Sequence, residues 1–326
     1  MSGDDTGGPG SGGASGPREP EDLVRTQDFD TAAPIEVDIG NGLGSITVEL
    51  CTTDITHVEI RHDSAGGGAD WRSGLTGLLS WVSEQLSESG LRGGLGDRAF
   101  GERGGIREPI AEAVRQTRVD LTGNRLAVRT PSSVPLRAVP LAVLVRAPAD
   151  SQLGIRSSSG EVRITGPAGR VEVQSGGGAV SVERAGGTTV ARTGSGALRL
   201  GEMGAGVQAR SGSGDVEIAS VRAPSSVVTG SGAVWLGSVG SDVLVRSGSG
   251  AVTVAEATSG QLELITGSGE LRVALPAGVD AEVDLTSTTG TVRSDLDVAP
   301  EPTREEPALR IFGRSGSGDA LLTSAV

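Results

Sequence analysis

Residues 211–236 contain the unit that decides the fold, and they read SGSGDVEIASVRAPSSVVTGSGAVWL. The unit places Ser-Gly-Ser-Gly before two short runs of alternating apolar and variable residues, and it begins again at Thr229. The last glycine of the four, here called the marker glycine, recurs at Gly160, Gly178, Gly196, Gly214, Gly232, Gly250, Gly269, Gly290 and Gly318. The first five intervals are 18 residues, and the next three are 19, 21 and 28. A period this short indicates a stack of similar units rather than an ordinary globular core.

Each 18-residue unit carries two apolar pairs, at positions +2 and +4 and at positions +11 and +13 from the marker glycine. In the first unit these residues are Val162, Ile164, Val171 and Val173. Period-2 pairs separated by glycine-rich turns indicate short strands with one buried face. Two strands and two turns per unit predict one coil of a β-solenoid.

The 19-residue unit that begins at Gly250 supports this interpretation. Its second apolar pair, Leu262 and Leu264, comes one residue late, so the turn 255–260 absorbs the extra residue and the strand keeps its pattern. A slip within the strand would turn its apolar side outward. We therefore predict an all-β fold, a single-stranded, right-handed parallel β-helix with coils ~4.8 Å apart. The alternative is an antiparallel meander, but the repeats lack the two-residue Asn-Gly or Asp-Gly turns that hairpins favour.

The marker glycines are predicted to be structural turn residues at the corners of the coils. Glycine allows positive φ and close approach of neighbouring backbones. The glycines assigned this role are Gly160, Gly178, Gly196, Gly214, Gly232, Gly250 and Gly269. A phosphate site is not expected at these turns, because the chain has no Lys and no turn opens a predicted helix.

The composition agrees with a thin core and excludes some partners. Glycine accounts for 53 of 326 residues, aromatic residues make up 2%, and Tyr is absent, so Val, Leu, Ile and Ala must fill the interior. The formal net charge of −13 opposes binding to nucleic acid or anionic lipid, although all 28 basic residues are Arg. Cys51 is the single cysteine, which excludes an intrachain disulfide.

The chain is predicted to divide into a disordered N-terminal tail, residues 1–22, and a β-solenoid domain, residues 23–326, with a helical insertion at residues 63–118. The tail is rich in Gly, Ser and Pro. Within the insertion, apolar residues from Trp71 to Leu86 follow a helical stripe, and a second helix is expected after Glu108. The insertion should pack on an end or a flank of the solenoid, or on a second chain.

The sequence contains neither a recognisable signal peptide nor an apolar run long enough for a membrane span. We therefore expect a cytoplasmic protein. Residues 295–308 are charged and contain three prolines. We expect this segment to fold over the C-terminal coils and to block that end of the stack.

Catalytic, metal and cofactor sites are not expected. A calcium-binding β-roll places Asp where these repeats carry Val or Leu, so the oxygen ligands are missing. His57 and His62 would point to opposite faces of one strand, which argues against a shared metal. Outward carboxylates are dispersed over different coils and faces. The prediction is a non-enzymatic chain without a cofactor.

Two surface features are candidate partner contacts. Trp235 is the aromatic member of an outward row and could anchor an interface, although a loop or the insertion could instead cover it. Four residues before the marker glycines, arginines recur with Gln174 and Val228 interposed. They are Arg156, Arg192, Arg210, Arg246 and Arg314. If the coils stack in register, these arginines form a row that could contact an acidic partner, or that counter-charges and water could solvate.

The recurring Ser/Thr-Gly-Ser-Gly-x-Val-x-Val unit, led by the strand region 29–50, resembles a bacterial β-strand-repeat family labelled "putative adhesin", whose function is unknown. The resemblance covers roughly residues 23–62 and 119–326. It implies a single-stranded β-helix and adhesin-like binding, and it implies no catalytic residues.

The leading functional hypothesis is therefore an adhesin-like binding or scaffold module that presents repetitive faces to a protein partner or to copies of itself. Nucleic acid is not an expected partner. Membrane contact by the insertion helix is disfavoured because that helix lacks a basic face. The alternative is a self-assembling scaffold of the bactofilin type, and open ends of the solenoid would distinguish it.

Overall fold

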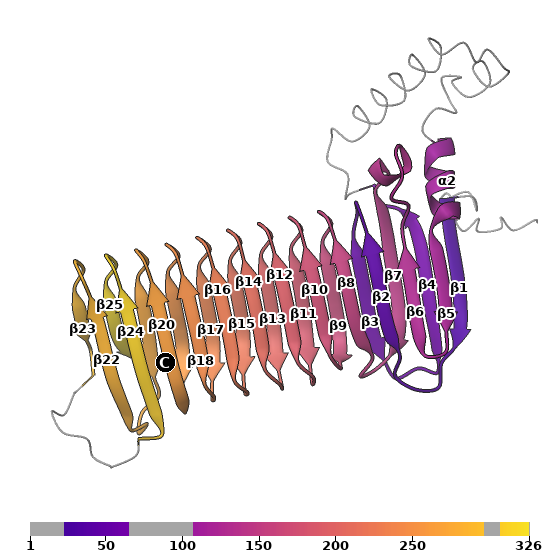
Figure 1. Ribbon diagram of the computed structural model, residues 1–326. Helices are drawn as coiled ribbons and strands as arrows, with labels where there is room; N and C mark the ends of the chain where they lie inside the picture. The colour runs from indigo at the N-terminus through magenta and orange to yellow at the C-terminus, as the bar shows by residue number, and fades with distance from the viewer. Residues whose placement is uncertain (1–22, 65–106, 297–306, 326) are drawn as a thin grey trace, which may run out of the picture.

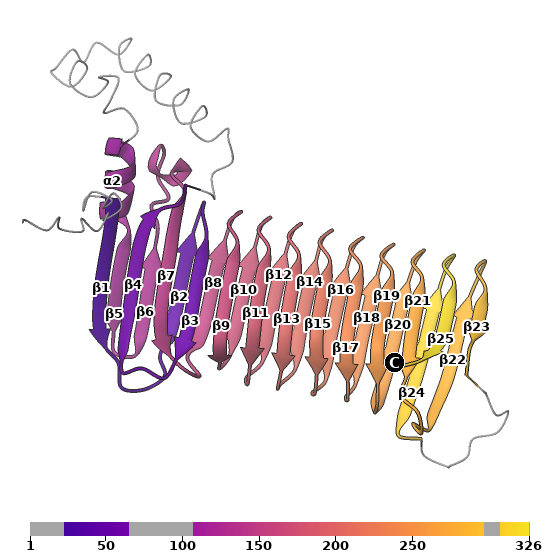
Figure 2. The same ribbon diagram turned by 180° about the vertical axis from the view of Figure 1, so that it is seen from behind.

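The protein is a long, flattened solenoid of two β-sheets (Figures 1 and 2). The computed structural model describes residues 23–64, 107–296 and 307–325. Within the solenoid the strands of each sheet run parallel, with one strand from every coil. The predicted all-β solenoid is confirmed.

The first sheet, called sheet A, has thirteen strands in the spatial order β1-β4-β7-β3-β9-β11-β13-β15-β17-β19-β21-β25-β23. Their bounds are β1 Val24–Asp30, β3 Ile46–Cys51, β4 Ile55–His62, β7 Leu141–Pro148, β9 Val162–Ala168, β11 Val180–Ala185, β13 Leu198–Met203, β15 Val216–Val221, β17 Val234–Val239, β19 Val252–Ala257, β21 Leu271–Leu275, β23 Val292–Ser294 and β25 Ala320–Ser324.

The second sheet, called sheet B, has twelve strands in the order β22-β24-β20-β18-β16-β14-β12-β10-β8-β2-β6-β5. Their bounds are β2 Glu36–Asn41, β5 Arg118–Thr122, β6 Arg125–Arg129, β8 Gln152–Ser157, β10 Val171–Ser175, β12 Thr189–Thr193, β14 Val207–Ser211, β16 Ser225–Thr229, β18 Val243–Ser247, β20 Gly260–Thr266, β22 Ala281–Ser287 and β24 Leu309–Ser315. The described residues also include the helix α2, Arg107–Gln116, and the 3-10 turn η2, Leu136–Ala138.

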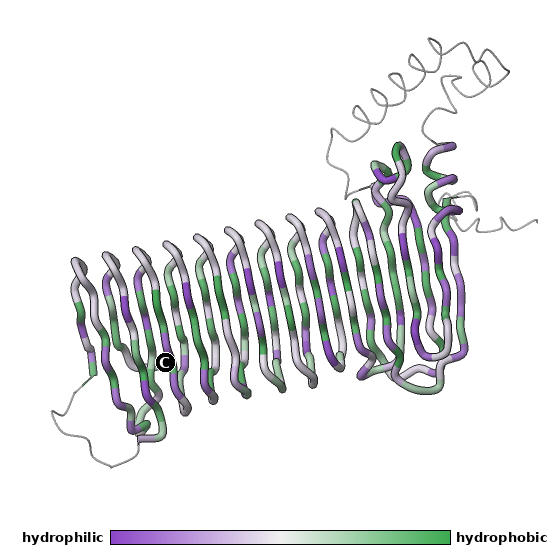
Figure 3. The backbone as a smooth tube through the Cα atoms, in the orientation of Figure 1, coloured by the Kyte–Doolittle hydropathy of each residue, from purple (hydrophilic) through white to green (hydrophobic). Residues whose placement is uncertain are grey.

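The interior coils bury alternate residues, as the two apolar pairs predict. Val216 and Ile218 of β15 are 1% and 0% exposed, whereas Glu217 between them faces solvent. Successive coils are in register, and Val216 pairs with Val234 of the next coil. Figure 3 shows the resulting alternation of hydrophobic and hydrophilic residues along the strands. The core is the thin apolar layer between the two sheets.

The corners that end in the marker glycines are held by close stacking and by a buried ladder of hydroxyl groups. A Cβ atom on Gly214 would lie 2.0 Å from the carbonyl oxygen of Gly196, so only glycine fits. The prediction of positive φ was wrong, because none of the marker glycines has positive φ. Inside each corner a Ser or Thr bonds to the marker glycine, as Ser211 Oγ does by donating to the carbonyl of Gly214 at 2.7 Å.

The coils at the N-terminal end do not follow the order of the chain. The coil of β2 and β3 lies directly beside β8 and β9, and the later strands β6 and β7 pack on its outer side. Beyond them, β4, β1 and β5 pair antiparallel. The helix α2 lies beside this end (Figure 1) and packs against β1 and β4.

The C-terminal end shows the same exchange in reverse. The last coil in sequence, β24 and β25, inserts between β20 and β21 on one side and β22 and β23 on the other. The coil β22–β23 is therefore the outermost one. Its inward residues Val283 and Leu285 are half-buried, and Val292 is 49% exposed.

The helix expected after Glu108 is confirmed as α2, whose buried face carries Ile110, Ala113 and Val114. The expected N-terminal tail and the stripe from Trp71 to Leu86 lie outside the described residues. The charged segment expected to cover the C-terminal coils also falls mostly outside them, at 297–306.

Candidate functional site

The predicted arginines do form a row across sheet B. Arg156 and Arg192 flank Gln174 in register, and Arg192 pairs directly with Arg210. Val228 then separates Arg210 from Arg246. Because neighbouring strands lie ~4.8 Å apart, the row runs along the solenoid axis with that step.

The N-terminal part of this row lines a groove of about 1360 Å³, here called the arginine groove. Its cationic residues are Arg129, Arg137, Arg156, Arg192 and Arg210. The loop 130–138 borders the groove at its N-terminal end, and the corner residues of β8, β10, β12 and β14 form one edge. Ser158 and Gly212 lie among these corner residues and are exposed, so a hydroxyl group and backbone face the groove beside the guanidinium groups. The hydroxyl of Thr193 is instead buried in its corner, where it accepts a hydrogen bond from the Gly196 amide at 3.0 Å.

The groove has an unbalanced positive charge. Among the residues that line it, none is Asp or Glu. Arg129 is paired with Asp38 beneath the groove. Arg137, Arg156, Arg192 and Arg210 make no ion pair with any residue in the described part of the chain, and all four are exposed. Farther along the row, Arg246 lies 3.7 Å from Glu263. The groove is therefore a cationic strip on an otherwise acidic protein.

Asp38 fixes the N-terminal boundary of this strip. Its Oδ2 accepts hydrogen bonds from Arg129 at 2.5 Å and from Arg125 at 2.9 Å. Partial burial alone would raise the pKa of Asp38, but the bonds and charges of the two arginines outweigh it, so its pKa lies below the usual value. Asp38 stays ionised and holds Arg129 at the groove.

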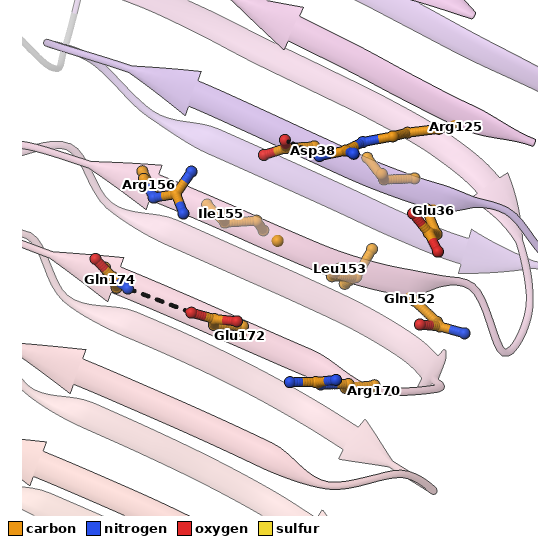
Figure 4. A pocket seen from close by; sticks show the side chains of 12 residues that line it. Glu36, Asp38, Arg125, Gln152, Leu153, Ile155, Arg156, Arg170, Glu172 and Gln174 are labelled. Atoms are coloured by element: carbon orange, nitrogen blue, oxygen red, sulfur yellow. Dashed lines mark hydrogen bonds and ion pairs between the residues drawn. The ribbon is translucent and has the colours of Figure 1, made fainter. Parts of the chain in front are cut away.

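A smaller hollow of about 300 Å³ lies beside the groove and shares Arg156 and Gln174 with it (Figure 4). Asp38 and Glu172 occupy the same cross-strand row as Gly154, on either side of it. A Cβ on Gly154 would come no closer than 3.7 Å to Asp38 Oδ1, so the backbone does not require glycine there. Arg156 borders both the hollow and the groove. The hollow carries both charge signs and has no single preferred ligand.

Trp235 lies on the opposite sheet. It belongs to β17 in sheet A, pairs in register with Glu217 and Thr253, and is 39% exposed. Its ring leans over Gly237, where an added Cβ would meet the ring at 3.1 Å. The expected cover by a loop is not found among the described residues. Trp235 and the arginine row therefore cannot belong to one continuous contact surface.

The other sequence candidates are not brought together. Within the described residues there is no group of three or more His, Cys, Asp or Glu that could hold a metal. His57 pairs with Asp28 at 2.5 Å near the N-terminal end, and Cys51 is exposed. No helix in the described ranges is long and apolar enough to cross a membrane. The cytoplasmic location stays a prediction.

Comparison with known proteins identifies the family to which this chain belongs. The family model described as Toastrack DUF4097 matches residues 141–323, which is more than half of the chain. The chain belongs to the Toastrack DUF4097 family. No curated protein matches it.

Two solved structures resemble this Toastrack chain. One is a "putative adhesin" from Bacteroides fragilis, 10% identical, with a TM-score of 0.35, covering 92% of this chain and 96% of its own. The other is a "putative cell adhesion protein" from Clostridium sporogenes, 8% identical, with a TM-score of 0.19, covering 92% of this chain and 99% of its own. Both TM-scores are below 0.5 and carry no further weight. The family agrees with the resemblance drawn from the repeat.

Sequence reasoning missed Arg129 and Arg137. Arg129 joins the row because Gly40 of β2 lies between it and Arg156, an arrangement that depends on the exchanged order of the first coils. Arg137 lies in η2, outside every repeat. The available signal was that Arg129 is the last residue of its strand and Arg156 the last but one of its own, but only the topology aligns the two strands.

Proposed function

We propose that this protein is a binding module whose arginine groove holds a linear, carboxylate-bearing polysaccharide. The observation that supports the proposal is a set of four arginines that make no ion pair with a described residue, in a groove whose described lining contains no acidic residue. Guanidinium groups bind carboxylates through paired, charge-assisted hydrogen bonds. An anionic ligand would neutralise a charge that the described residues leave uncompensated.

The geometry of the groove favours an extended chain laid along the solenoid. Arg192 and Arg210 are one coil apart, and Arg156 is two coils before Arg192, so the spacings between these cations are multiples of ~4.8 Å. One pyranose unit of an extended glycan advances by a similar distance. An extended peptide advances ~3.3 Å per residue, which does not keep step with the coils.

The walls of the groove also distinguish a glycan from a peptide or a nucleic acid. The strands beneath it are interior members of sheet B, so they offer no free edge to which a peptide could add. No aromatic residue lines the groove, so bases would find no stacking platform. The exposed Ser132 and Ser158 instead supply hydroxyl groups suited to sugar hydroxyls.

A test compares polygalacturonate with its fully methyl-esterified form, which has the same backbone without the charges. We expect the wild-type chain to bind only the acid form in calorimetric titration, and more weakly as salt increases. The double variant R192A/R210A should bind about tenfold more weakly or worse, because two charge-assisted contacts are lost. The double variant R163A/R199A on sheet A removes the same charge and should retain the wild-type affinity.

Several outcomes would contradict the proposal. Equal binding of the ester, or equal loss in the sheet A control, would show that the groove is not the site. Tighter binding of poly-L-glutamate would assign an acidic peptide instead, and tighter binding of single-stranded DNA would assign a nucleic acid. Absence of binding to any of the four polymers would leave the groove without this function.

A further inference from the structure

The two ends of the solenoid differ in how completely their apolar interior is covered. At the N-terminal end, Val119 of β5 is 7% exposed, Phe29 and Leu121 are half-buried, and antiparallel strands and α2 pack there. At the C-terminal end, the described residues leave Val283 and Leu285 half-buried and Val292 49% exposed. The corresponding residues of interior coils, such as Val216 and Ile218, are 1% and 0% exposed.

The outermost C-terminal strands also have one free hydrogen-bonding edge each. β22 pairs only with β24, and β23 pairs only with β25. β22 has no proline and no bulge, and its two charged side chains, Glu282 and Asp284, both point outward. Such an edge is a template for another strand.

We propose that a second copy of this chain covers this end, so that two solenoids join tail to tail about a two-fold axis. A two-fold axis normal to the sheets reverses the strand direction and keeps each sheet on its own side. β22 would then pair antiparallel with β22 of the second copy, and β23 would pair with its own counterpart. The contact is self-complementary and closed, as expected of a dimer rather than a filament.

The outward residues of β22 are compatible with this pairing in one register. If Leu285 faces Leu285 of the second copy, Asp284 faces Thr286 and Glu282 faces Thr288. The register centred on Val283 would instead oppose Glu282 and Asp284, and the register centred on Asp284 would oppose two aspartates. A shift of the β22 pairing by an odd number of residues would place inward-facing side chains opposite outward-facing ones. Glu282 already pairs with Arg310 within its own chain at 3.3 Å.

The same axis gives charge complementarity in sheet A. Leu285 and Ser294 each lie three residues from the corner 288–291, so an axis through Leu285 passes close to Ser294. Centring β23 on Ser294 places Arg293 opposite Asp295 of the second copy, and this contact occurs twice. It also places the exposed Val292 against Leu296 of the second copy. Both Arg293 and Asp295 are exposed in the single chain.

Head-to-tail association lacks this complementarity. The N-terminal edge strand β1 carries Asp28 and Asp30 on its exposed positions, and its Arg25 is tied to the carbonyl of Thr117 at 2.6 Å. A filament would need this edge to accept β23 of another chain. The structure therefore favours a closed dimer over the bactofilin-like filament.

The test is a charge swap read out by molar mass. Light scattering on the full chain across a concentration series, without polymer, should show a monomer–dimer equilibrium. The variants R293D and D295R should each weaken the dimer about tenfold or more, because like charges then meet twice. The double variant R293D/D295R should restore it. The control R163D lies within the solenoid and should leave the equilibrium unchanged.

Other coverings of the C-terminal end would give different results in this test. A monomer at all concentrations overturns the proposal, and so does a double variant that fails to recover. Growth beyond the dimer would indicate a filament. If replacing residues 297–306 with a Gly-Ser linker of equal length creates a dimer that the natural chain does not form, that segment, and not a second copy, covers the edge. None of these outcomes depends on the arginine groove.

Discussion

The interior of the solenoid and its two ends obey different constraints, although the same kind of coil builds both. In the interior each coil is confined by a neighbour on either side, so the corner sequence recurs and the spatial order follows the chain. At each end the chain exchanges the order of two coils. The comparison shows that the repeat pattern is a consequence of packing between two neighbouring coils. The pattern weakens where one neighbouring coil is absent or is replaced by antiparallel strands.

The corner glycines provide the largest expected difference between the two regions. Gly212 and Gly42 occupy the same place in their corners, in an interior coil and in the first coil respectively. A Cβ on Gly212 would lie 2.4 Å from the carbonyl oxygen of Gly194, whereas a Cβ on Gly42 would lie 3.7 Å from that of Arg137. We expect G212A to lose about 3 kcal/mol of stability by overpacking, and G42A to stay within about 0.5 kcal/mol.

Chemical denaturation of the two variants beside the wild-type chain measures this difference. Equal losses would mean that the corner is constrained by its own conformation and not by the coil next to it. Equal tolerance would mean that neighbouring coils move apart at little cost.

Leucine truncation should give a smaller difference of the same kind. Leu200 in the interior is 2% exposed, whereas Leu285 in the outermost coil is half-buried. L200A should cost about 3 kcal/mol because it leaves a cavity, and L285A about 1 kcal/mol because its site can relax or fill with water. The thermal midpoint, measured at concentrations where the chain is monomeric, ranks the two. A larger loss for L285A would show that the outermost coil is as well packed as the interior.

The sequence predicts the interior well because the pattern there has one physical cause. Val216 and Ile218 must point inward and Gly214 must fit under Gly196, so spacing alone predicts strands, corners and the in-register arginine row. Neither the insertion of β24 between β20 and β22 nor the place of Arg129 beside Gly40 could be predicted in this way. Those arrangements depend on which strands pair across long stretches of sequence, and the local repeat pattern does not specify such pairings.

The residues of the candidate site likewise fall into those that the repeat predicts and those that it does not. Arg156, Arg192 and Arg210 follow from the repeat, whereas Arg137 enters the groove from a loop without a repeat. The sequence also offered Trp235 as a separate candidate contact, and it lies on sheet A, whereas the arginine row lies on sheet B. The 18-residue period predicts which residues align across successive coils. Which of the two sheets carries them depends on their position within the coil.

Removal of an ion pair should give the smallest difference in stability loss between the two regions. Measuring stability as a function of pH can detect that difference. Asp38 near the N-terminal end binds two arginines from a strand some 90 residues away, and only 14% of its side chain is exposed. The interior pair Arg199 and Glu217 lies at 3.6 Å with both side chains more than half exposed. We expect D38N to cost about 1 kcal/mol at neutral pH, and E217Q to cost less than about 0.3 kcal/mol.

The pH dependence follows from the direction of the pKa shift. Because the pKa of Asp38 is lower in the folded chain than in the unfolded chain, its contribution is complete above the unfolded value of about 3.9 and is lost as the pH falls through the folded value. The stability difference between wild type and D38N should therefore be constant from about pH 5 to 8 and shrink below about pH 4. Urea denaturation at a series of pH values measures it. A difference that persists unchanged at pH 3 would show that Asp38 acts by shape and hydrogen bonding, and not by the charge that holds Arg129 at the groove.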